Sequence, residues 1–104
     1  MPAQLLAPAD TPAILARMLR NLLQIYRERG DAEHALAAVD LMLVLTPDGT
    51  DELRIRADLY ERLECWTAAR DDLRRCLAAV PRAPDAQWMR ARLARLERLA
   101  LRTH

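Results

Sequence analysis

Residues 53–81, LRIRADLYERLECWTAARDDLRRCLAAVP, repeat the pattern of residues 19–47, LRNLLQIYRERGDAEHALAAVDLMLVLTP. Placing Leu53 on Leu19 also aligns an internal Tyr, a small residue after it and a Pro at the end. The identical pairs include Leu19/Leu53, Arg20/Arg54, Tyr26/Tyr60, Ala35/Ala69, Leu43/Leu77 and Pro47/Pro81. Some matches arise by chance in a chain so rich in Leu, Ala and Arg, so their positions carry the argument. These positions indicate that the second segment is an internal repeat of the first.

The composition around this repeat favours helices. Leu and Ala each occur 19 times, whereas Val and Ile together occur only six times. Leu and Ala are strong helix formers, and the β-branched residues that favour strands are scarce. Between the turn-forming residues, apolar residues recur three and four positions apart, which is the spacing of one helix face. We therefore predict an all-α fold.

Turn-forming residues divide the chain into five helical stretches. Thr11 before Pro12 predicts a helix start with Thr11 as the N-cap, and Gly30 before Asp31 predicts a stop followed by a new cap. Further breaks fall at residues 47–50, 64–65 and 81–84. Because the connections are short, the first four helices should form two antiparallel hairpins.

These breaks predict the domain organisation. We expect a leader or linker at residues 1–10, containing Leu5 and Leu6, and one helical domain at residues 11–104. Within it, the repeats cover residues 16–49 and 50–83, and a closing helix covers residues 84–102. The result is a five-helix α–α superhelix.

The apolar side chains of each stretch should form the core. In the first stretch these are Leu15, Met18, Leu19, Leu22, Leu23 and Tyr26. Ala35 and Ala69 occur at equivalent places in the two repeats, so we expect both to be buried where two helices cross. Trp66 follows an apolar stripe and is expected in the core, whereas Trp88 either closes the core or lies exposed.

The repeated residues resemble the tetratricopeptide repeat, a helix–turn–helix unit whose small residues let two helices approach closely. Positions that fit its pattern include Leu19, Tyr26, Ala35 and Pro47, and their partners in the second repeat. Four positions depart from the pattern. Arg56 stands at a usual Leu position, Glu64 at a frequent Gly position, and Met42 and Cys76 at a usual Ala position.

A closer resemblance lies in the amino-acid sequences of several segments. RMLRNLLQIYRERGD (residues 17–31), LTPDG (45–49), DELRIRADLYERL (51–63) and VPRAPDAQWMRARL (80–93) resemble the C-terminal region of bacterial SirB-type transglutaminase-like proteins. In that family a transglutaminase-like or protease-like N-terminal domain precedes a short tetratricopeptide region. The resemblance implies that this chain is a C-terminal module, and that the catalytic half lies outside it.

Charge and hydropathy narrow the functional classes. All 16 basic residues are Arg, against 15 acidic residues, which gives a net charge of +1. Residues 82–104 are locally basic, with six Arg against Asp85 and Glu97. One alternative is therefore a helical nucleic-acid-binding protein that uses Arg90, Arg95 and Arg98. No apolar run is long enough to cross a bilayer, and we expect a cytoplasmic protein.

Little in the sequence supports catalysis. Cys65 and Cys76 are too far apart along a helix for a disulfide, and we expect both thiols to be reduced. Cys65 together with His34 gives the second alternative, a small Cys-dependent enzyme, but no orienting group or oxyanion donor accompanies them. Neither the two Cys nor the two His have the close spacing of metal ligands. We expect no enzyme activity, no cofactor and no metal.

The residues best placed to bind a partner lie on the first helix of each repeat, which tetratricopeptide arrays turn toward their concave surface. This candidate protein-binding groove consists of Arg17, Arg20, Asn21, Gln24, Arg54 and Asp58. Arg20 and Arg54, one repeat apart, would act as carboxylate-binding anchors. The alternative is an ordinary solvated surface. The expected partner is a protein: the chain's own N-terminal domain, a second copy or another protein.

Overall fold

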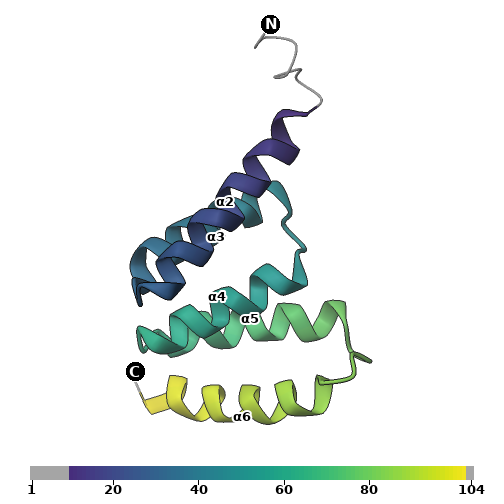
Figure 1. Cartoon of the computed structure of the whole chain (residues 1–104). Coiled ribbons are helices and arrows are strands. Elements are labelled where there is room, and N and C mark those ends of the chain that lie inside the picture. Colours follow the sequence, from purple (N-terminus) through teal and green to yellow (C-terminus); the bar gives the residue numbers. More distant parts are fainter. Residues whose placement is uncertain (1–9, 103–104) are drawn as a thin grey trace, which may run out of the picture. The chain divides into compact units, whose positions relative to one another are not determined.

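The computed structural model describes residues 10–102, and within that range it contains α-helices and no strand (Figure 1). The helices are α2 (Thr11–Glu28), α3 (Ala32–Leu45), α4 (Thr50–Arg62), α5 (Trp66–Ala79) and α6 (Ala86–Arg102). The predictions of an all-α fold and of five helical stretches are confirmed. The predicted leader, with Leu5 and Leu6, lies outside the described residues except for Asp10.

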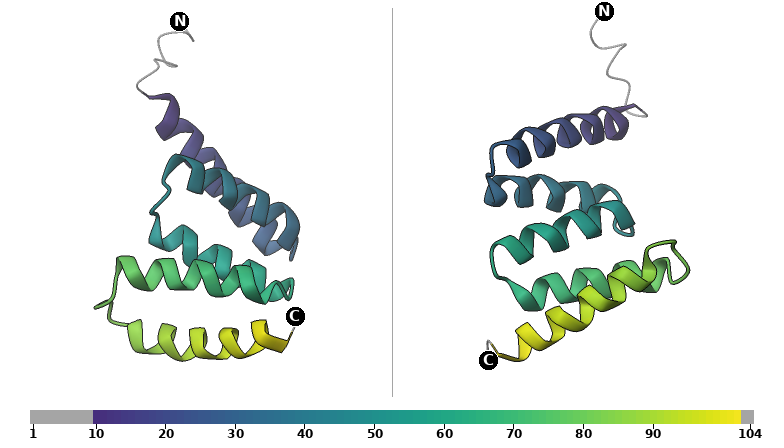
Figure 2. Two further views of the ribbon diagram at one scale, coloured as in Figure 1. Left: turned by 180° about the vertical axis from the view of Figure 1, so that it is seen from behind. Right: turned by 60° about the horizontal axis from the view of Figure 1, so that its bottom comes forward.

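Close packing divides the chain into two compact units, Met1–Pro47 and Asp48–His104. In the first unit α2 packs against α3 as an antiparallel hairpin, and in the second α4 packs against α5 in the same way (Figure 2). The remaining helix, α6, packs against α5. The two predicted hairpins are confirmed, whereas the single domain over residues 11–104 and its repeat limits stay predictions.

The start of α2 lies one residue earlier than we predicted. Asp10, not Thr11, occupies the N-cap position, because the backbone carbonyl of Asp10 accepts a hydrogen bond from the N–H of Ile14 at 3.0 Å. The Asp10 side chain makes no capping hydrogen bond. Pro12 is tolerated in this first turn because the N–H groups there have no partner within the helix.

The turns that end α2 and α4 have the same geometry, as the repeat predicts. The N–H of Asp31 donates to the carbonyl of Tyr26 at 2.9 Å, and the N–H of Cys65 donates to the carbonyl of Tyr60 at 2.8 Å. Such turns need a left-handed residue at the end of the helix. Gly30 fills that place with φ +70°, and Glu64 fills the equivalent place with φ +58°.

Glu64→Gly should stabilise the chain by about 0.5–1 kcal/mol. A side chain in the left-handed region costs about 1–2 kcal/mol, and the larger unfolded-state entropy of Gly takes back part of the gain. Gly30→Ala should destabilise by a similar amount, although no atom lies within 4 Å of the added Cβ, because strain remains without a clash. Urea unfolding measures both changes. Equal and opposite shifts support the turn geometry, and a loss of stability in Glu64→Gly contradicts it.

Each unit has its own apolar core. In the first unit it consists of Leu19, Leu23, Ala35, Ala38, Val39, Met42 and Leu43, and in the second mainly of Leu53, Ala57, Leu59, Ala69, Leu73, Cys76, Met89 and Leu96. Ala35 and Ala69 are both fully buried, which confirms the prediction from the repeat. Small side chains at these places let the paired helices pack closely.

Part of the predicted core of α2 is wrong. Leu15, Met18 and Leu22 are exposed, with 40%, 55% and 40% of their surface accessible, while Leu19 and Leu23 are buried. The physical reason is that α3 covers only one side of α2. The apolar residues of α2 extend over more of its circumference than this single neighbour can cover.

The second unit contains a buried ion pair between α4 and α5. The Nε and Nη2 atoms of Arg56 donate to the two carboxylate oxygens of Asp72, each at 2.7 Å. The Asp72 side chain is only 5% exposed and that of Arg56 only 18%. This two-pronged contact explains how Arg56 is accommodated at a position where the tetratricopeptide pattern has Leu. The guanidinium also lies over the Tyr60 ring, 5.7 Å from its centre.

Candidate protein-binding groove

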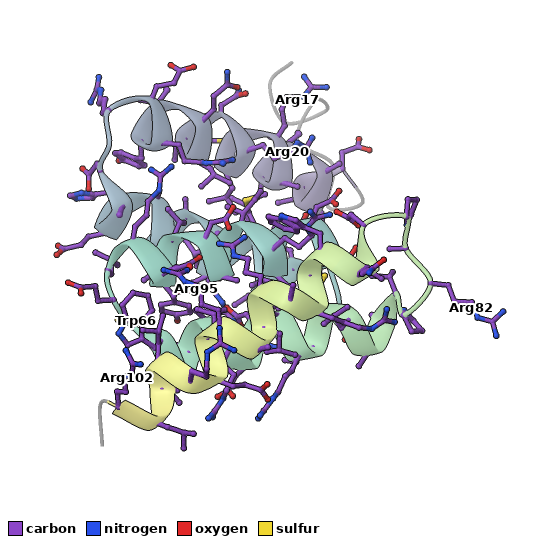
Figure 3. All side chains as sticks on the ribbon, turned by 90° about the horizontal axis from the view of Figure 1, so that it is seen from below. Arg17, Arg20, Trp66, Arg82, Arg95 and Arg102 are labelled. Atoms are coloured by element: carbon purple, nitrogen blue, oxygen red, sulfur yellow. The ribbon has the colours of Figure 1, made fainter. Side chains whose placement is uncertain are left out.

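The α2 part of the predicted groove is exposed. Arg17, Arg20, Asn21 and Gln24 all have exposed side chains, and Figure 3 shows Arg17 and Arg20 projecting from the helix. The amide of Gln24 donates to the carboxylate of Glu28 at 3.1 Å. These four residues form the polar side of α2, which leaves them accessible to a partner.

Beside this polar side runs a row of exposed apolar residues, which we call the apolar stripe: Leu15, Met18, Leu22 and Ile25. Their spacing of three, four and three residues is the spacing of the seam in a two-helix coiled coil. Ile14, also exposed, borders the stripe. A solvated helix face is normally polar, so a continuous row of large apolar side chains indicates a surface that packs against another element.

The α4 part of the predicted groove makes ion pairs with α6 and the turn before it. Arg54 pairs with Asp85 at 2.6 Å, and Asp58 pairs with Arg92. Arg54 and Asp58 also line one shallow hollow of about 370 Å³, together with Asp51 and Ile55. The structure therefore brings Arg54 and Asp58 together, while Arg17, Arg20, Asn21 and Gln24 belong to the other unit.

An ionic cluster lies one turn further along α4. The carboxylate of Glu61 accepts hydrogen bonds from both Arg92 and Arg95 of α6. Burial alone would lower the pKa of Arg92, but its hydrogen bonds to Glu61 and Asp58 outweigh this effect and raise the pKa. Arg92 also lies over the Trp88 ring, 5.3 Å from its centre. Side-chain ion pairs thus connect α6 to α4.

This cluster forms one wall of a second hollow, which we call the Trp66 hollow. Its volume is about 380 Å³, and it is lined by Asp58, Glu61, Arg62, Trp66, Arg92 and Arg95. Of the α4 and α6 residues that line this hollow, only Asp58 was predicted to belong to the protein-binding groove. A signal was available, because Asp58, Glu61 and Arg62 lie on one face of α4, and Arg92 and Arg95 are one turn apart on α6.

Neither tryptophan is fully buried in the core. Trp66, expected in the core, is only partly buried because it lines the Trp66 hollow. Trp88, for which the sequence left two possibilities, is exposed over 55% of its surface. The side chain that closes the core near Trp88 is instead that of Met89, which is fully buried.

The two cysteines and His34 each make local contacts within their own unit. Cys76 is fully buried, and this burial raises the pKa of its thiol. Its sulfur lies 3.7 Å from the carbonyl of Thr50 and 3.9 Å from the sulfur of Met89, as expected of a core residue. Cys65 is exposed, and its thiol faces the carbonyl of Leu63 at 3.7 Å.

His34 has a local structural role. Its Nδ1 lies 2.7 Å from the carboxylate of Asp31, and its ring stacks on Tyr26 at 5.1 Å. The backbone N–H of His34 donates to the same carboxylate, and this hydrogen bond caps α3. The same hydrogen bond is the main cause of the lowered pKa of Asp31. Asp31 therefore acts as the cap that the sequence predicted.

Three further observations bear on the alternatives. Among residues 10–102, no three His, Cys, Asp or Glu side chains are grouped so that they could hold a metal ion. Over the same range, no helix combines the length and the apolar character needed to span a membrane. Of the Arg residues considered for nucleic acid, Arg90 donates to the carbonyl of Pro81 at 2.7 Å and Arg95 pairs with Glu61.

The described residues show three features of a helical repeat: paired helices, equivalent turns in the two repeats, and small buried residues at the repeated positions. The tetratricopeptide repeat model matches residues 22–94. The chain belongs to the tetratricopeptide repeat family. Repeats of this kind generally mediate interactions between proteins and are not enzymes.

Several bacterial proteins are similar to this chain over most of its length. A UPF0162 protein of Xylella fastidiosa is 34% identical over 102 residues, which are 98% of this chain and 36% of that protein. A UPF0162 protein of Pseudomonas aeruginosa is 37% identical over 72% of this chain and 28% of its own length. Protein SirB1 of Salmonella typhimurium is 28% identical over 82% of this chain and 32% of its own length.

The predicted resemblance to SirB-type proteins is thus confirmed. The chain spans about a third of the length of the curated relatives that it matches. No solved structure matches it.

Proposed function

We propose that this chain is a non-catalytic protein-docking module, and that α2 packs against either a transglutaminase-like domain or a second copy of the chain. The observation that carries this proposal is the apolar stripe of Leu15, Met18, Leu22 and Ile25. Covering these four side chains removes apolar surface from water, which is the main favourable term in protein association. Membership of the tetratricopeptide repeat family supports a protein as the partner.

The coiled-coil spacing of the stripe favours a helix as the element that packs on it. The exposed polar side of α2, with Arg17, Arg20, Asn21 and Gln24, then lies at the rim of the interface. Polar rims add orientation and specificity to an apolar centre. We also infer a cytoplasmic setting, since both thiols are free and such a compartment keeps them reduced.

The test is an association measurement with paired variants. Met18→Glu combined with Leu22→Glu should weaken association by more than about tenfold, because it places two charges in an apolar interface. Self-association is measured by sedimentation equilibrium. Binding to the transglutaminase-like domain of a SirB-type relative is measured by calorimetric titration. The melting temperature should stay unchanged, since both side chains are exposed.

Val44→Glu is the matched control, because Val44 is an apolar residue of α3 that is 73% exposed but lies outside the stripe. It should leave association unchanged. Arg20→Glu tests the polar rim and should have a smaller effect, as expected of an exposed charge. If the double variant associates as tightly as the wild type in both assays, the apolar stripe is not the docking surface.

A further inference from the structure

We propose that the Trp66 hollow of the second unit binds an acidic segment of a partner protein, with a carboxylate on Arg95 and Arg62 and an adjoining apolar side chain against Trp66. The proposal rests on the proposed function, since it assumes a protein partner, but it concerns a different unit from α2. The charges, exposure and contacts of the residues that line the hollow support it.

The hollow has an excess of positive charge. Three Arg and two carboxylates line it, together with Trp66. Arg92 is paired with both carboxylates, those of Asp58 and Glu61. Arg62 and Arg95 supply the remaining positive charge, and Arg95 shares the Glu61 carboxylate with Arg92. A ligand that complements this balance carries negative charge.

Arg95 is already oriented for such a ligand. Its Nη1 donates to Oε1 of Glu61, whose side chain is only 17% exposed and is therefore well fixed. The Arg95 side chain itself remains 56% exposed, and a guanidinium has five N–H donors. Because one of its bonds fixes the group, a carboxylate arriving from solvent binds with little further loss of side-chain freedom.

Trp66 gives the hollow an apolar wall beside these donors. Figure 3 shows Trp66 and Arg95 in the same region beside α6, whereas Arg82 projects from the connection between α5 and α6. A volume of about 380 Å³ is that of a small ligand site and accommodates one or two side chains. A segment with an acidic residue beside an apolar one can pair with the Arg side chains and pack against Trp66 at the same time.

The carboxylates in the lining favour an acidic peptide over nucleic acid. Asp58 and Glu61 face the same space as the Arg residues, so a chain of consecutive phosphates would be repelled at two points. An acidic peptide places one or two negative charges at Arg62 and Arg95 and has no need to continue past Asp58. The charge pattern therefore favours a ligand that is negatively charged and that has only one or two consecutive negative groups.

The experiment is a titration followed by NMR. The chain has two Trp, and Trp66→Phe identifies the indole N–H signal of Trp66. The probe is the peptide acetyl-Leu-Asp-Glu-Leu-amide, and its matched control is acetyl-Leu-Asn-Gln-Leu-amide. We expect the acidic peptide to shift the Trp66 signal with a Kd of about 1 mM or tighter. The amide peptide should leave the signal in place.

Three variants locate the carboxylate. Arg95→Gln should weaken binding of the acidic peptide by about tenfold and Arg62→Gln by about threefold, because each removes a charged donor. Arg82→Gln, a change in the α5–α6 connection, should leave the affinity unchanged. The pair of Arg95 with Glu61 is partly exposed, so melting should change little, and Arg62→Gln provides a second variant if Arg95→Gln is poorly folded.

The proposal is overturned if both peptides shift the signal equally, if neither shifts it at about 1 mM, or if the Arg62 and Arg95 variants bind like the wild type. It is also overturned if a single-stranded oligonucleotide shifts the Trp66 signal at lower concentration than the acidic peptide. Failure of these experiments leaves the association test of α2 untouched. The failure of one proposal is therefore distinguishable from the failure of the other.

Discussion

Asp72→Ala should lower the free energy of unfolding by about 3 kcal/mol, because it removes the buried carboxylate that pairs with the largely buried Arg56 guanidinium. Asp72 is 3% exposed and accepts hydrogen bonds from the Nε and Nη2 atoms of Arg56. Urea unfolding followed by circular dichroism measures the loss.

Asp71→Ala is the matched control for this substitution. Asp71 is the preceding residue of α5, its side chain is 55% exposed, and it pairs with Arg70 at 2.9 Å. An exposed pair contributes less than about 1 kcal/mol. The double variant Arg56→Leu/Asp72→Leu should recover most of the loss, since apolar residues of similar volume can replace a buried pair. Equal effects of Asp71→Ala and Asp72→Ala would show that the pair is not buried.

Ala69→Leu should destabilise the chain by about 1–3 kcal/mol through overpacking. Ala69 is fully buried in α5, which packs against both α4 and α6, so the added atoms have no open side to occupy. Ala78→Leu makes the same change at an exposed position of the same helix and should be nearly neutral. Thermal melting monitored by circular dichroism compares the two. Similar melting shifts would contradict the assigned repeat positions.

The sequence predicted the fold because its local signals agree with one another. Apolar spacing, turn residues and the internal repeat all indicate the same five helices. Gly30 and Asp31 are recognisable from the sequence as a stop and a cap, and both have those roles in the structure. The burial of Ala35 and Ala69 followed from their recurrence alone. Such agreement is characteristic of sequences that specify one structure.

What the sequence did not predict depends on which element covers which side chain. Spacing placed Leu15, Met18 and Leu22 on an apolar side of α2, but could not show that α3 covers only part of that side. The pairing of Arg56 with Asp72 joins two helices across 16 residues, and only a three-dimensional arrangement specifies it. The position of Arg56 at a usual Leu place was the available signal, and by itself it indicates only a departure from the pattern.

The candidate groove was harder to predict for the same reason. Arg54 and Asp58 were expected to face a partner because they lie on the first helix of a repeat, yet both pair with side chains in or just before α6. The Trp66 hollow depends on α4, α5 and α6 together, and the spacing within any one of them shows only part of it. A function that depends on several helices therefore becomes visible only after they are assembled.

The way α6 is joined to its unit has a consequence for local unfolding. The backbone of α6 packs closely on α5 but not on α4. Ion pairs link α4 to α6 through Asp58 and Glu61, and to the residue before α6 through Arg54. The pairs Arg54–Asp85 and Arg95–Glu61 are partly exposed, and such pairs are screened by dissolved salt, whereas apolar packing is not weakened in this way. Rising ionic strength therefore lowers the free energy needed to release α6 more than the free energy needed to open the α4–α5 hairpin. Amide hydrogens of α6 then exchange with solvent through local opening, while those of α4 and α5 await unfolding of the whole unit.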